Sequence, residues 1–127
     1  MIPNSLRRWF VVHFVMDVLF AVPLLIAPAL TMRLFGWQTV DPFTVRLVGA
    51  ALMAIGVESL LGRNAGVEAF RGMLNLKIIW SASAIIGMLA TLLMGDAPPA
   101  GWLFVAIFAA FHVVWVYSRV KLREGQG

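Results

Sequence analysis

Four long apolar stretches, separated by short polar segments, make up most of this chain. They cover about residues 9–28, 43–61, 72–94 and 102–120. Each stretch is apolar on all sides rather than along one face, which is typical of a helix surrounded by lipid. At about 1.5 Å per residue, each is long enough to cross ~30 Å of hydrocarbon. The pattern predicts an all-α membrane protein: a bundle of four transmembrane helices that forms one domain over residues 1–127.

Local signals indicate where these helices begin and end. Pro23 lies inside the first stretch, where it removes a backbone hydrogen bond and predicts a kink. The segment Leu34-Phe35-Gly36-Trp37 is expected to form a short piece at the membrane surface. Asp41-Pro42 predicts a helix start and Gly62 a helix end. Residues 95–99, Gly-Asp-Ala-Pro-Pro, are the clearest predicted loop.

The first stretch follows two arginines, as the apolar core of a signal peptide would. His13 and Asp17 interrupt it, however, and three further apolar stretches follow. We therefore expect it to be retained as a transmembrane helix.

Positive charge predicts the orientation of the four helices. Two of the ten Lys and Arg residues, Arg33 and Arg46, fall on one side of the predicted membrane. The other eight fall on the side of both termini: Arg7, Arg8, Arg63, Arg71, Lys77, Arg119, Lys121 and Arg123. Because Lys and Arg are enriched on the cytoplasmic side, both termini are predicted to be cytoplasmic. Trp9, Trp37 and Trp102 lie at the ends of apolar stretches, as aromatic residues at a membrane interface do.

Composition agrees with a membrane protein and excludes several functions. Hydrophobic residues make up 61% of the chain and charged residues 13%, against about a quarter charged in soluble domains. The absence of cysteine excludes iron–sulfur ligation, thiolate zinc sites and thiol–disulfide exchange. The net charge of +4 does not indicate nucleic-acid binding, because the charges flank apolar stretches instead of forming a basic groove. Gly49 and Gly56 in the second stretch would let helix backbones pack closely.

Ionisable residues inside the apolar stretches are the main indication of function. At the bilayer centre each costs about 2.5–3.5 kcal/mol, so each needs a partner, a wet cavity or a route to the interface. The outer half holds only Arg46, and the others fall in the predicted cytoplasmic half. Asp17 is the deepest, ~12 Å inward from Trp9. We expect a polar pocket open to the cytoplasm. The candidate ligand-binding or proton-binding residues are His13, Asp17, Glu58, Asn75, Lys77, His112 and Trp115.

Each of these residues also has a structural interpretation. Lys77, like Arg46, is expected to extend toward lipid headgroups, and Glu58 to neutralise Lys77 or an arginine of the adjacent loop. His13 and Asp17 are one helical turn apart and could satisfy each other without a function. His112, among aromatic residues, could simply be a hydrogen-bonded packing residue.

Metal and cofactor sites receive little support from residue spacing. His13 and His112 lie at similar predicted depths on different helices, which is the geometry for bis-histidine ligation of haem b. A metal site from Asp17, Glu58 and the histidines is chemically allowed, but no spacing motif supports it. No nucleophile–base arrangement, glycine-rich phosphate loop or paired-carboxylate motif occurs, so we predict no catalytic residue.

Several motifs together resemble the DoxX-like group of small bacterial four-helix membrane proteins. They are Pro28, the segments Leu34-Phe35-Gly36-Trp37 and Asp41-Pro42, and Arg46-Leu47-Val48-Gly49-Ala50-Ala51-Leu52 leading to Gly56. The likeness covers roughly the first half of the chain, and its core is an Arg three residues before a Gly in the second helix. The resemblance implies a four-helix bundle in a bacterial inner membrane and, for some members, association with quinone-linked redox partners. It implies no catalytic residue.

Three functions remain open. The first is a binding or accessory protein, whose pocket holds a lipophilic molecule (a quinone, a lipid or a pigment) or which docks on a larger membrane complex. The second is a small proton-coupled transporter that works as a homo-oligomer, with Asp17 as the titrating residue. The third is a membrane enzyme that acts on a lipid, with His13 or His112 as acid–base group. The bilayer is the one partner that all three share.

Overall fold

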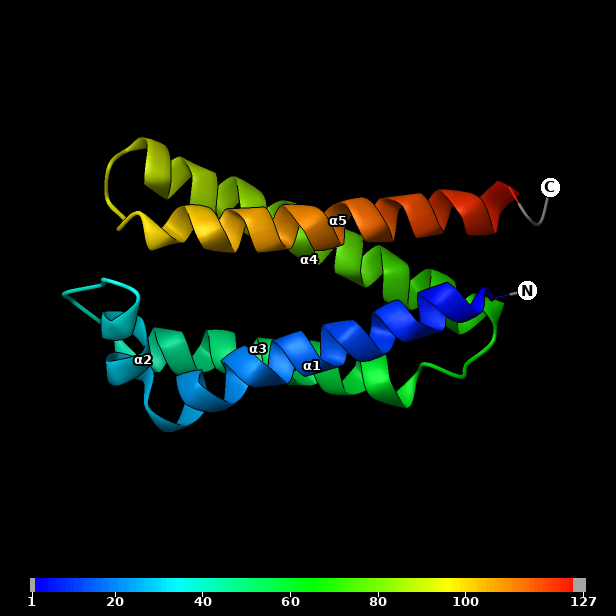
Figure 1. The fold of residues 1–127 in the computed structure, drawn as a ribbon, viewed down its shortest axis with the longest axis horizontal. Helices are drawn as coiled ribbons and strands as arrows, with labels where there is room; N and C mark the ends of the chain where they lie inside the picture. The colour runs from blue at the N-terminus through cyan, green and yellow to red at the C-terminus, as the bar shows by residue number, and fades with distance from the viewer. Residues whose placement is uncertain (1, 125–127) are drawn as a thin grey trace. The chain divides into compact units, whose positions relative to one another are not determined.

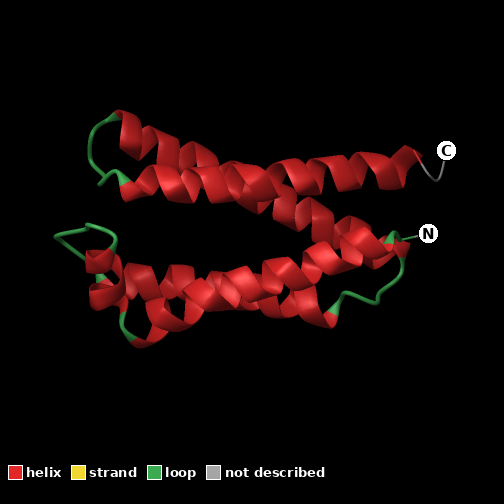
Figure 2. Ribbon diagram, viewed as in Figure 1, coloured by secondary structure: helices red, strands yellow, loops and turns green. Residues whose placement is uncertain are grey.

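A computed structural model of the chain describes residues 2–124. Its elements, in order, are α1 (Asn4–Ile26), α2 (Pro28–Leu34), α3 (Pro42–Leu61), α4 (Val67–Leu93) and α5 (Ala100–Glu124) (Figure 1). No strand occurs among residues 2–124 (Figure 2). Four of the helices, α1, α3, α4 and α5, are long and apolar enough to cross a membrane. This confirms the predicted all-α fold and makes the chain a small multi-pass membrane protein.

The helices begin earlier or end later than the apolar stretches where charged residues flank them. α1 begins at Asn4 and α4 at Val67, each five residues before the predicted span, and α5 continues to Glu124. Arg, Lys and Glu are good helix formers, so charged flanks extend a helix without adding apolar length. The apolar pattern therefore marks the lipid-facing part of each helix, and the helix itself is longer.

The segment after α1 differs from the sequence-based expectation. α1 ends at Ile26, because Pro28 has no N–H to continue the ladder, and Pro28 then starts α2. We expected only a short surface piece at residues 34–37, but α2 is a helix of seven residues. The hydroxyl of Thr31 joins the two helices by donating to the carbonyls of Ala27 at 2.7 Å and Pro23 at 3.1 Å.

Capping residues account for the helix ends. The side chain of Asp41 accepts from the Phe43 N–H at 3.1 Å, which confirms the helix start predicted from Asp41-Pro42. α3 ends at Gly62, also as predicted. α2 and α4 each end in a Schellman motif whose left-handed residue is a glycine, Gly36 (φ 105°) and Gly95 (φ 78°).

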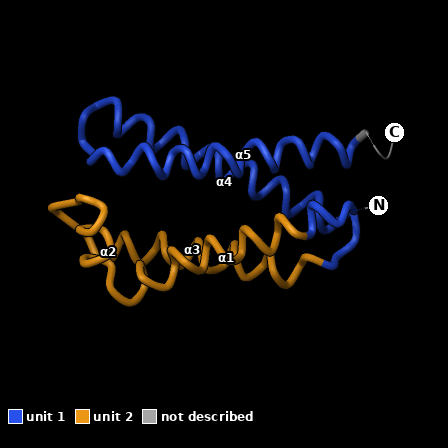
Figure 3. Tube along the Cα trace, viewed as in Figure 1, with its two compact units in different colours: residues 1–7, 64–127 blue, residues 8–63 orange. Residues whose placement is uncertain are grey.

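The chain divides into two compact units (Figure 3). One unit spans Arg8–Arg63 and holds α2, α3 and all but the first turn of α1; the other combines residues 1–7 with 64–127 and holds α4 and α5. The prediction of one domain over residues 1–127 stays a prediction.

In the unit Arg8–Arg63, α1 and α3 pack closely through small residues. A Cβ added at Gly49 would lie 3.1 Å from Leu25 Cγ, and one added at Gly56 would lie 2.7 Å from Asp17 Cβ. Buried positions on both helices recur every three or four residues: Phe10, His13, Asp17, Ala21 and Leu24 on α1, and Gly49, Leu52, Gly56 and Ser59 on α3. The two polar residues of α1 thus lie on its buried stripe.

In the other unit, α4 and α5 are antiparallel and pack from Asn75 and Arg119 to Leu92 and Gly101, whereas the first turns of α4 diverge from the end of α5 (Figure 1). Asn75 contacts Arg119, Lys77 contacts Trp115, and Ser81 contacts His112, so positions further along α4 meet positions earlier in α5. The buried stripe of α4 has the same three-or-four spacing: Phe70, Leu74, Lys77 and Ser81. Here too, polar residues occupy buried positions of a transmembrane helix.

Candidate functional site

Three buried polar side chains meet between α1 and α3; we call them the α1–α3 cluster: His13, Asp17 and Ser59. His13 and Asp17 are 4% and 5% exposed, and Ser59 is fully buried. Nε2 of His13 lies 3.3 Å from Oδ2 of Asp17, one helical turn further along α1. Nδ1 of the same ring lies 3.4 Å from the hydroxyl of Ser59 on α3. The structure thus brings the two predicted residues together and adds a third from the neighbouring helix.

Ser59 contacts both its own helix and His13. Its hydroxyl donates to the carbonyl of Ile55 at 3.0 Å, and at the 3.4 Å contact with Nδ1 of His13 the donor depends on the tautomer of the ring. When Nδ1 carries the ring proton, Nε2 turns a lone pair toward Asp17; when Nε2 carries it, the N–H lies on the side of the carboxyl.

Oδ2 of Asp17 is a buried oxygen without a hydrogen bond. Among residues 2–124, none donates to it. The 3.3 Å approach of His13 Nε2 is within ion-pair distance, but its direction is not that of a hydrogen bond. Leaving a buried acceptor unsatisfied costs about 1–3 kcal/mol, and more if it is charged. Asp17 therefore has unused hydrogen-bonding capacity in the apolar part of α1.

A second group of polar residues lies between α4 and α5; we call it the α4–α5 cluster: Lys77, Ser81, His112 and Trp115. The Nζ of Lys77 lies 4.9 Å from the ring centroid of Trp115, within cation–π range. Lys77 is 2% exposed and Trp115 1% exposed. The expectation that Lys77 extends toward the headgroups is therefore wrong, because its ammonium is held against a buried aromatic ring.

Ser81 fixes the orientation of His112. Ser81 Oγ lies 2.7 Å from Nδ1 of His112 and donates its own proton to the carbonyl of Ile78 at 3.2 Å. In this contact Nδ1 of His112 donates in the tautomer that carries its proton there, and accepts from the Ser81 hydroxyl in the other tautomer. Two aromatic pairs flank this contact: Trp80 with Phe108, with centroids 6.0 Å apart, and Phe111 stacked on Trp115 at 5.7 Å.

Two of the predicted site residues lie outside the buried clusters. Glu58 is exposed on α3, and its predicted pairing with Lys77 or a loop arginine stays a prediction. Asn75 is also exposed, and its Oδ1 accepts from Nε of Arg119 at 3.0 Å. Both are on the surface of their helices instead of in the core.

Sequence reasoning missed the two serines, because single serines in apolar stretches are common. The signal that could have found them is spacing. Ser59 follows Gly56 by three residues, and Ser81 follows Lys77 by four, so each lies on the buried stripe of its helix. Reading polar residues by helical face would have paired each serine with a packing helix.

The geometry does not favour the metal and haem alternatives. No group of three or more His, Cys, Asp or Glu side chains within residues 2–124 is arranged to hold a metal ion. Bis-histidine ligation would require a ring nitrogen of His13 to face the iron, whereas Nδ1 faces Ser59 and Nε2 faces Asp17. The residues present around His13 do not fit haem.

Arg46, the arginine of the DoxX-like motif, has a structural role in this chain. Its Nε donates to the carbonyl of Leu25 at 3.0 Å, near the end of α1, where carbonyls lack helical partners. Gly49, one turn later, lets α3 approach the same part of α1. This arginine thus joins two helices while its side chain stays exposed, and its predicted extension toward headgroups stays a prediction.

Comparisons with known proteins add no family: no family model, no curated protein and no solved structure matches the chain. The resemblance to the DoxX-like group stays a prediction that rests on its short motifs. Function is therefore inferred from the buried polar clusters of the chain itself.

Proposed function

We propose that this membrane protein binds a lipophilic small molecule that donates a hydrogen bond to Asp17. The observation that carries the proposal is the buried Oδ2 of Asp17, which accepts no hydrogen bond from residues 2–124. Native structures rarely leave such an atom unsatisfied, so each case calls for an explanation. A hydroxyl or amine of a bound molecule would remove the penalty of about 1–3 kcal/mol.

The position of Asp17 restricts what the ligand can be. It lies in the middle of α1, between apolar residues that the membrane-spanning pattern assigns to hydrocarbon depth. A molecule that reaches this depth must be largely apolar, with one polar group to meet the carboxyl. Gly56 closes off the α3 side, since even a Cβ there would lie 2.7 Å from Asp17 Cβ. A lipid, quinone or pigment with one donor group has this chemistry.

The test is to purify the full-length protein in mild detergent and identify its bound small molecules by mass spectrometry. Asp17→Asn keeps the side-chain shape but replaces one acceptor oxygen by an amide donor, so the ligand should be lost. Asp96→Asn makes the same chemical change at an exposed position and should retain it. An identical set of bound molecules in both variants would contradict the proposal.

A second variant separates a binding role from a structural one. Replacing a desolvated polar pair by apolar residues is often neutral or stabilising. His13→Phe/Asp17→Leu should therefore fold and melt at the same temperature or higher, while losing the bound molecule. A higher melting temperature with an unchanged set of bound molecules would assign the pair to structure alone.

Proton-coupled transport is the second candidate, because Asp17 is a carboxyl in the middle of a membrane-spanning helix with Nε2 of His13 3.3 Å from its Oδ2. Proteoliposomes with an internal pH indicator would test this. Proton uptake that is lost in Asp17→Asn but kept in Asp96→Asn would favour transport, and uptake equal to that of empty liposomes would exclude it.

Docking on a larger membrane complex needs a test of its own, separate from ligand identification and proton uptake. The same gentle purification would then recover stoichiometric partner subunits. Recovery of the chain alone, or as a homo-oligomer, would contradict an accessory role.

A further inference from the structure

Positive charge gathers at the end of the α4–α5 pair where α4 begins and α5 ends. By sequence, five positive and two negative side chains belong to this end: Arg7, Arg71, Arg119, Lys121 and Arg123, with Glu68 and Glu124. Arg7 is held within the same unit, since it donates to the carbonyl of Ala65 at 3.3 Å and lies over the ring of Phe70 at 5.3 Å. The excess of positive charge therefore belongs to the unit of residues 1–7 and 64–127.

The register of the two helices places three of these arginines within about one turn of each other at the same end of the pair. Arg119 donates through Nε to Asn75 at 3.0 Å, which sets the two helices side by side at that level. Because the helices are antiparallel, the residue one turn before Asn75 is level with the residue one turn after Arg119. These residues are Arg71 and Arg123. We call Arg71, Arg119 and Arg123 the arginine site.

The surrounding residues neutralise this site only in part. Nη1 of Arg71 lies 3.0 Å from Oε1 of Glu68, whose side chain is 89% exposed. Nε of Arg71 is buried and has no hydrogen-bond partner among residues 2–124. Arg119 has five N–H donors, and the bond to Asn75 uses one of them. Because Nε of Arg71 is buried, an anion would be met by the remaining N–H groups of Arg119 and by the positive charge of the three guanidinium groups.

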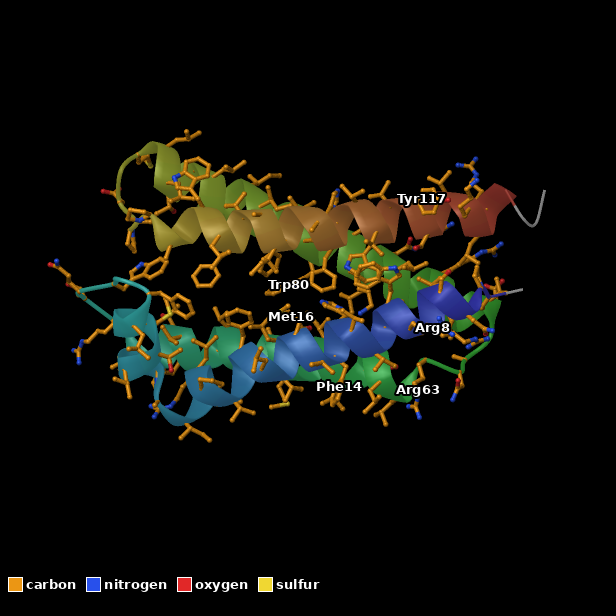
Figure 4. The ribbon with its side chains drawn as sticks, viewed as in Figure 1. Arg8, Phe14, Met16, Arg63, Trp80 and Tyr117 are labelled. Atoms are coloured by element: carbon orange, nitrogen blue, oxygen red, sulfur yellow. The ribbon has the colours of Figure 1, made fainter. Side chains whose placement is uncertain are left out.

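Aromatic residues place the site at the level of lipid headgroups. Tyr117 lies in the C-terminal part of α5, is exposed, and has Nζ of Lys121 5.6 Å from its ring centroid (Figure 4). Exposed Tyr with a neighbouring Lys is typical of the boundary between hydrocarbon and headgroups. Arg119 and Arg123 lie just beyond Tyr117 along the helix, where phosphate groups are found.

We propose that the arginine site binds the phosphate group of an anionic phospholipid from the adjacent leaflet. Guanidinium groups match phosphate in geometry and can bind it through paired hydrogen bonds. Basic residues clustered at the end of transmembrane helices are a known means of recognising anionic headgroups. The site lies in α4 and α5 and does not depend on a ligand at Asp17.

The experiment measures lipid retention by native mass spectrometry of the full-length protein in detergent. Phosphatidylglycerol and phosphatidylcholine with the same acyl chains are added separately, and glycerol 3-phosphate serves as the headgroup without chains. Phosphatidylglycerol should bind and raise the melting temperature. Phosphatidylcholine and glycerol 3-phosphate at equal concentration should do neither.

Charge-matched variants locate the site. Arg123→Gln, at an exposed position, should weaken phosphatidylglycerol binding about five-fold, and Arg119→Gln/Arg123→Gln further. Arg33→Gln removes the same charge from an exposed position of α2 and should bind phosphatidylglycerol like the parent. Binding by the parent should also weaken as salt concentration rises, which tests the proposal without any variant.

Three results would overturn the proposal. Equal retention of the two phospholipids would show that the negative charge of the headgroup does not determine binding. Equal binding by Arg123→Gln and Arg33→Gln would place the lipid elsewhere. An equal rise in melting temperature with glycerol 3-phosphate and with phosphatidylglycerol would identify a site for a free anion instead of a lipid.

Discussion

Two serines hold two histidines in the same way, one in each unit. Ser59 and Ser81 each donate to a carbonyl of their own helix and contact Nδ1 of a histidine on the neighbouring helix. The contact fixes the orientation of each ring, and for His13 it turns Nε2 toward Asp17. Serine is well suited to this position because it is small enough for close helix packing and still has a hydroxyl.

The serine contact at His13 can be tested by removing it. Ser59→Ala removes the hydroxyl that contacts Nδ1 of His13, and a buried polar atom left unsatisfied costs about 1–3 kcal/mol. We expect a lower melting temperature in detergent. Ser83→Ala, which changes an exposed serine of α4, should have no measurable effect. Equal melting temperatures for the two variants would show that Ser59 contributes nothing to holding His13.

At the level of single helices, the α1–α3 contact depends on a glycine beside the site. A Cβ at Gly56 would lie 2.7 Å from the Cβ of Asp17, an atom that cannot move without the backbone of α1. Gly56→Ala should therefore separate the helices and destabilise the protein by about 1–3 kcal/mol. Gly87→Ala is the matched control, because nothing lies within 4 Å of a Cβ at that position of α4.

The two alanine variants should shift in opposite directions. Alanine favours a helix by about 1 kcal/mol over glycine, so Gly87→Ala should be neutral or stabilising. Thermal unfolding followed by circular dichroism measures both. If Gly56→Ala were as stable as Gly87→Ala, close packing of α3 on Asp17 would not be a property of the protein.

The start of α3 gives a pH dependence that can be worked out from its cap. The Thr44 hydroxyl, with smaller contributions from backbone N–H groups, holds the pKa of Asp41 below its ordinary value. A carboxyl with a lowered pKa in the folded state stabilises the protein above its ordinary pKa. That stabilisation is lost as the pH falls through the lowered value.

Asp41→Asn keeps a capping side chain but does not titrate. The difference in melting temperature between the parent and Asp41→Asn should therefore shrink as the pH falls below about 4. Thr44→Val, which removes the donating hydroxyl, should bring the pKa of Asp41 closer to its ordinary value. The loss of stability on acidification should therefore begin at a higher pH than in the parent. A difference that is constant between neutral and strongly acidic pH would mean that the charge of Asp41 does not stabilise the cap.

Elements were predictable to different degrees. The four spans and the caps at Asp41 and Gly62 follow from apolar length and local backbone chemistry, which the sequence displays directly. α2 was not foreseen, because seven residues after a proline are too few for a periodic pattern. The partners of His13 and Lys77 could not be derived either, since they depend on which faces of separate helices meet.

At the scale of the whole molecule, orientation is the prediction on which a cytoplasmic site depends. Short connections force successive spans to alternate in direction. α3 and α4 are joined by residues 62–66, so we predict that the end of α3 and the start of α4 lie on one side of the membrane. By the same alternation, the start of α1 and the end of α5 are predicted to share that side, where eight of the ten Lys and Arg residues fall.

Positive charge is retained on the cytoplasmic side during insertion. A reporter fused after Gly127 should therefore read cytoplasmic, as should one inserted at Asn64-Ala65, whereas one inserted at Ala97-Pro98 should read external. The insertion at Asn64-Ala65 is the internal control, because it tests alternation without relying on the chain end. If the first two reporters read external and the third cytoplasmic, the four spans would stand but the charge argument would be wrong. The arginine site would then face the outer leaflet, and Asp17 would be reached from outside the cell.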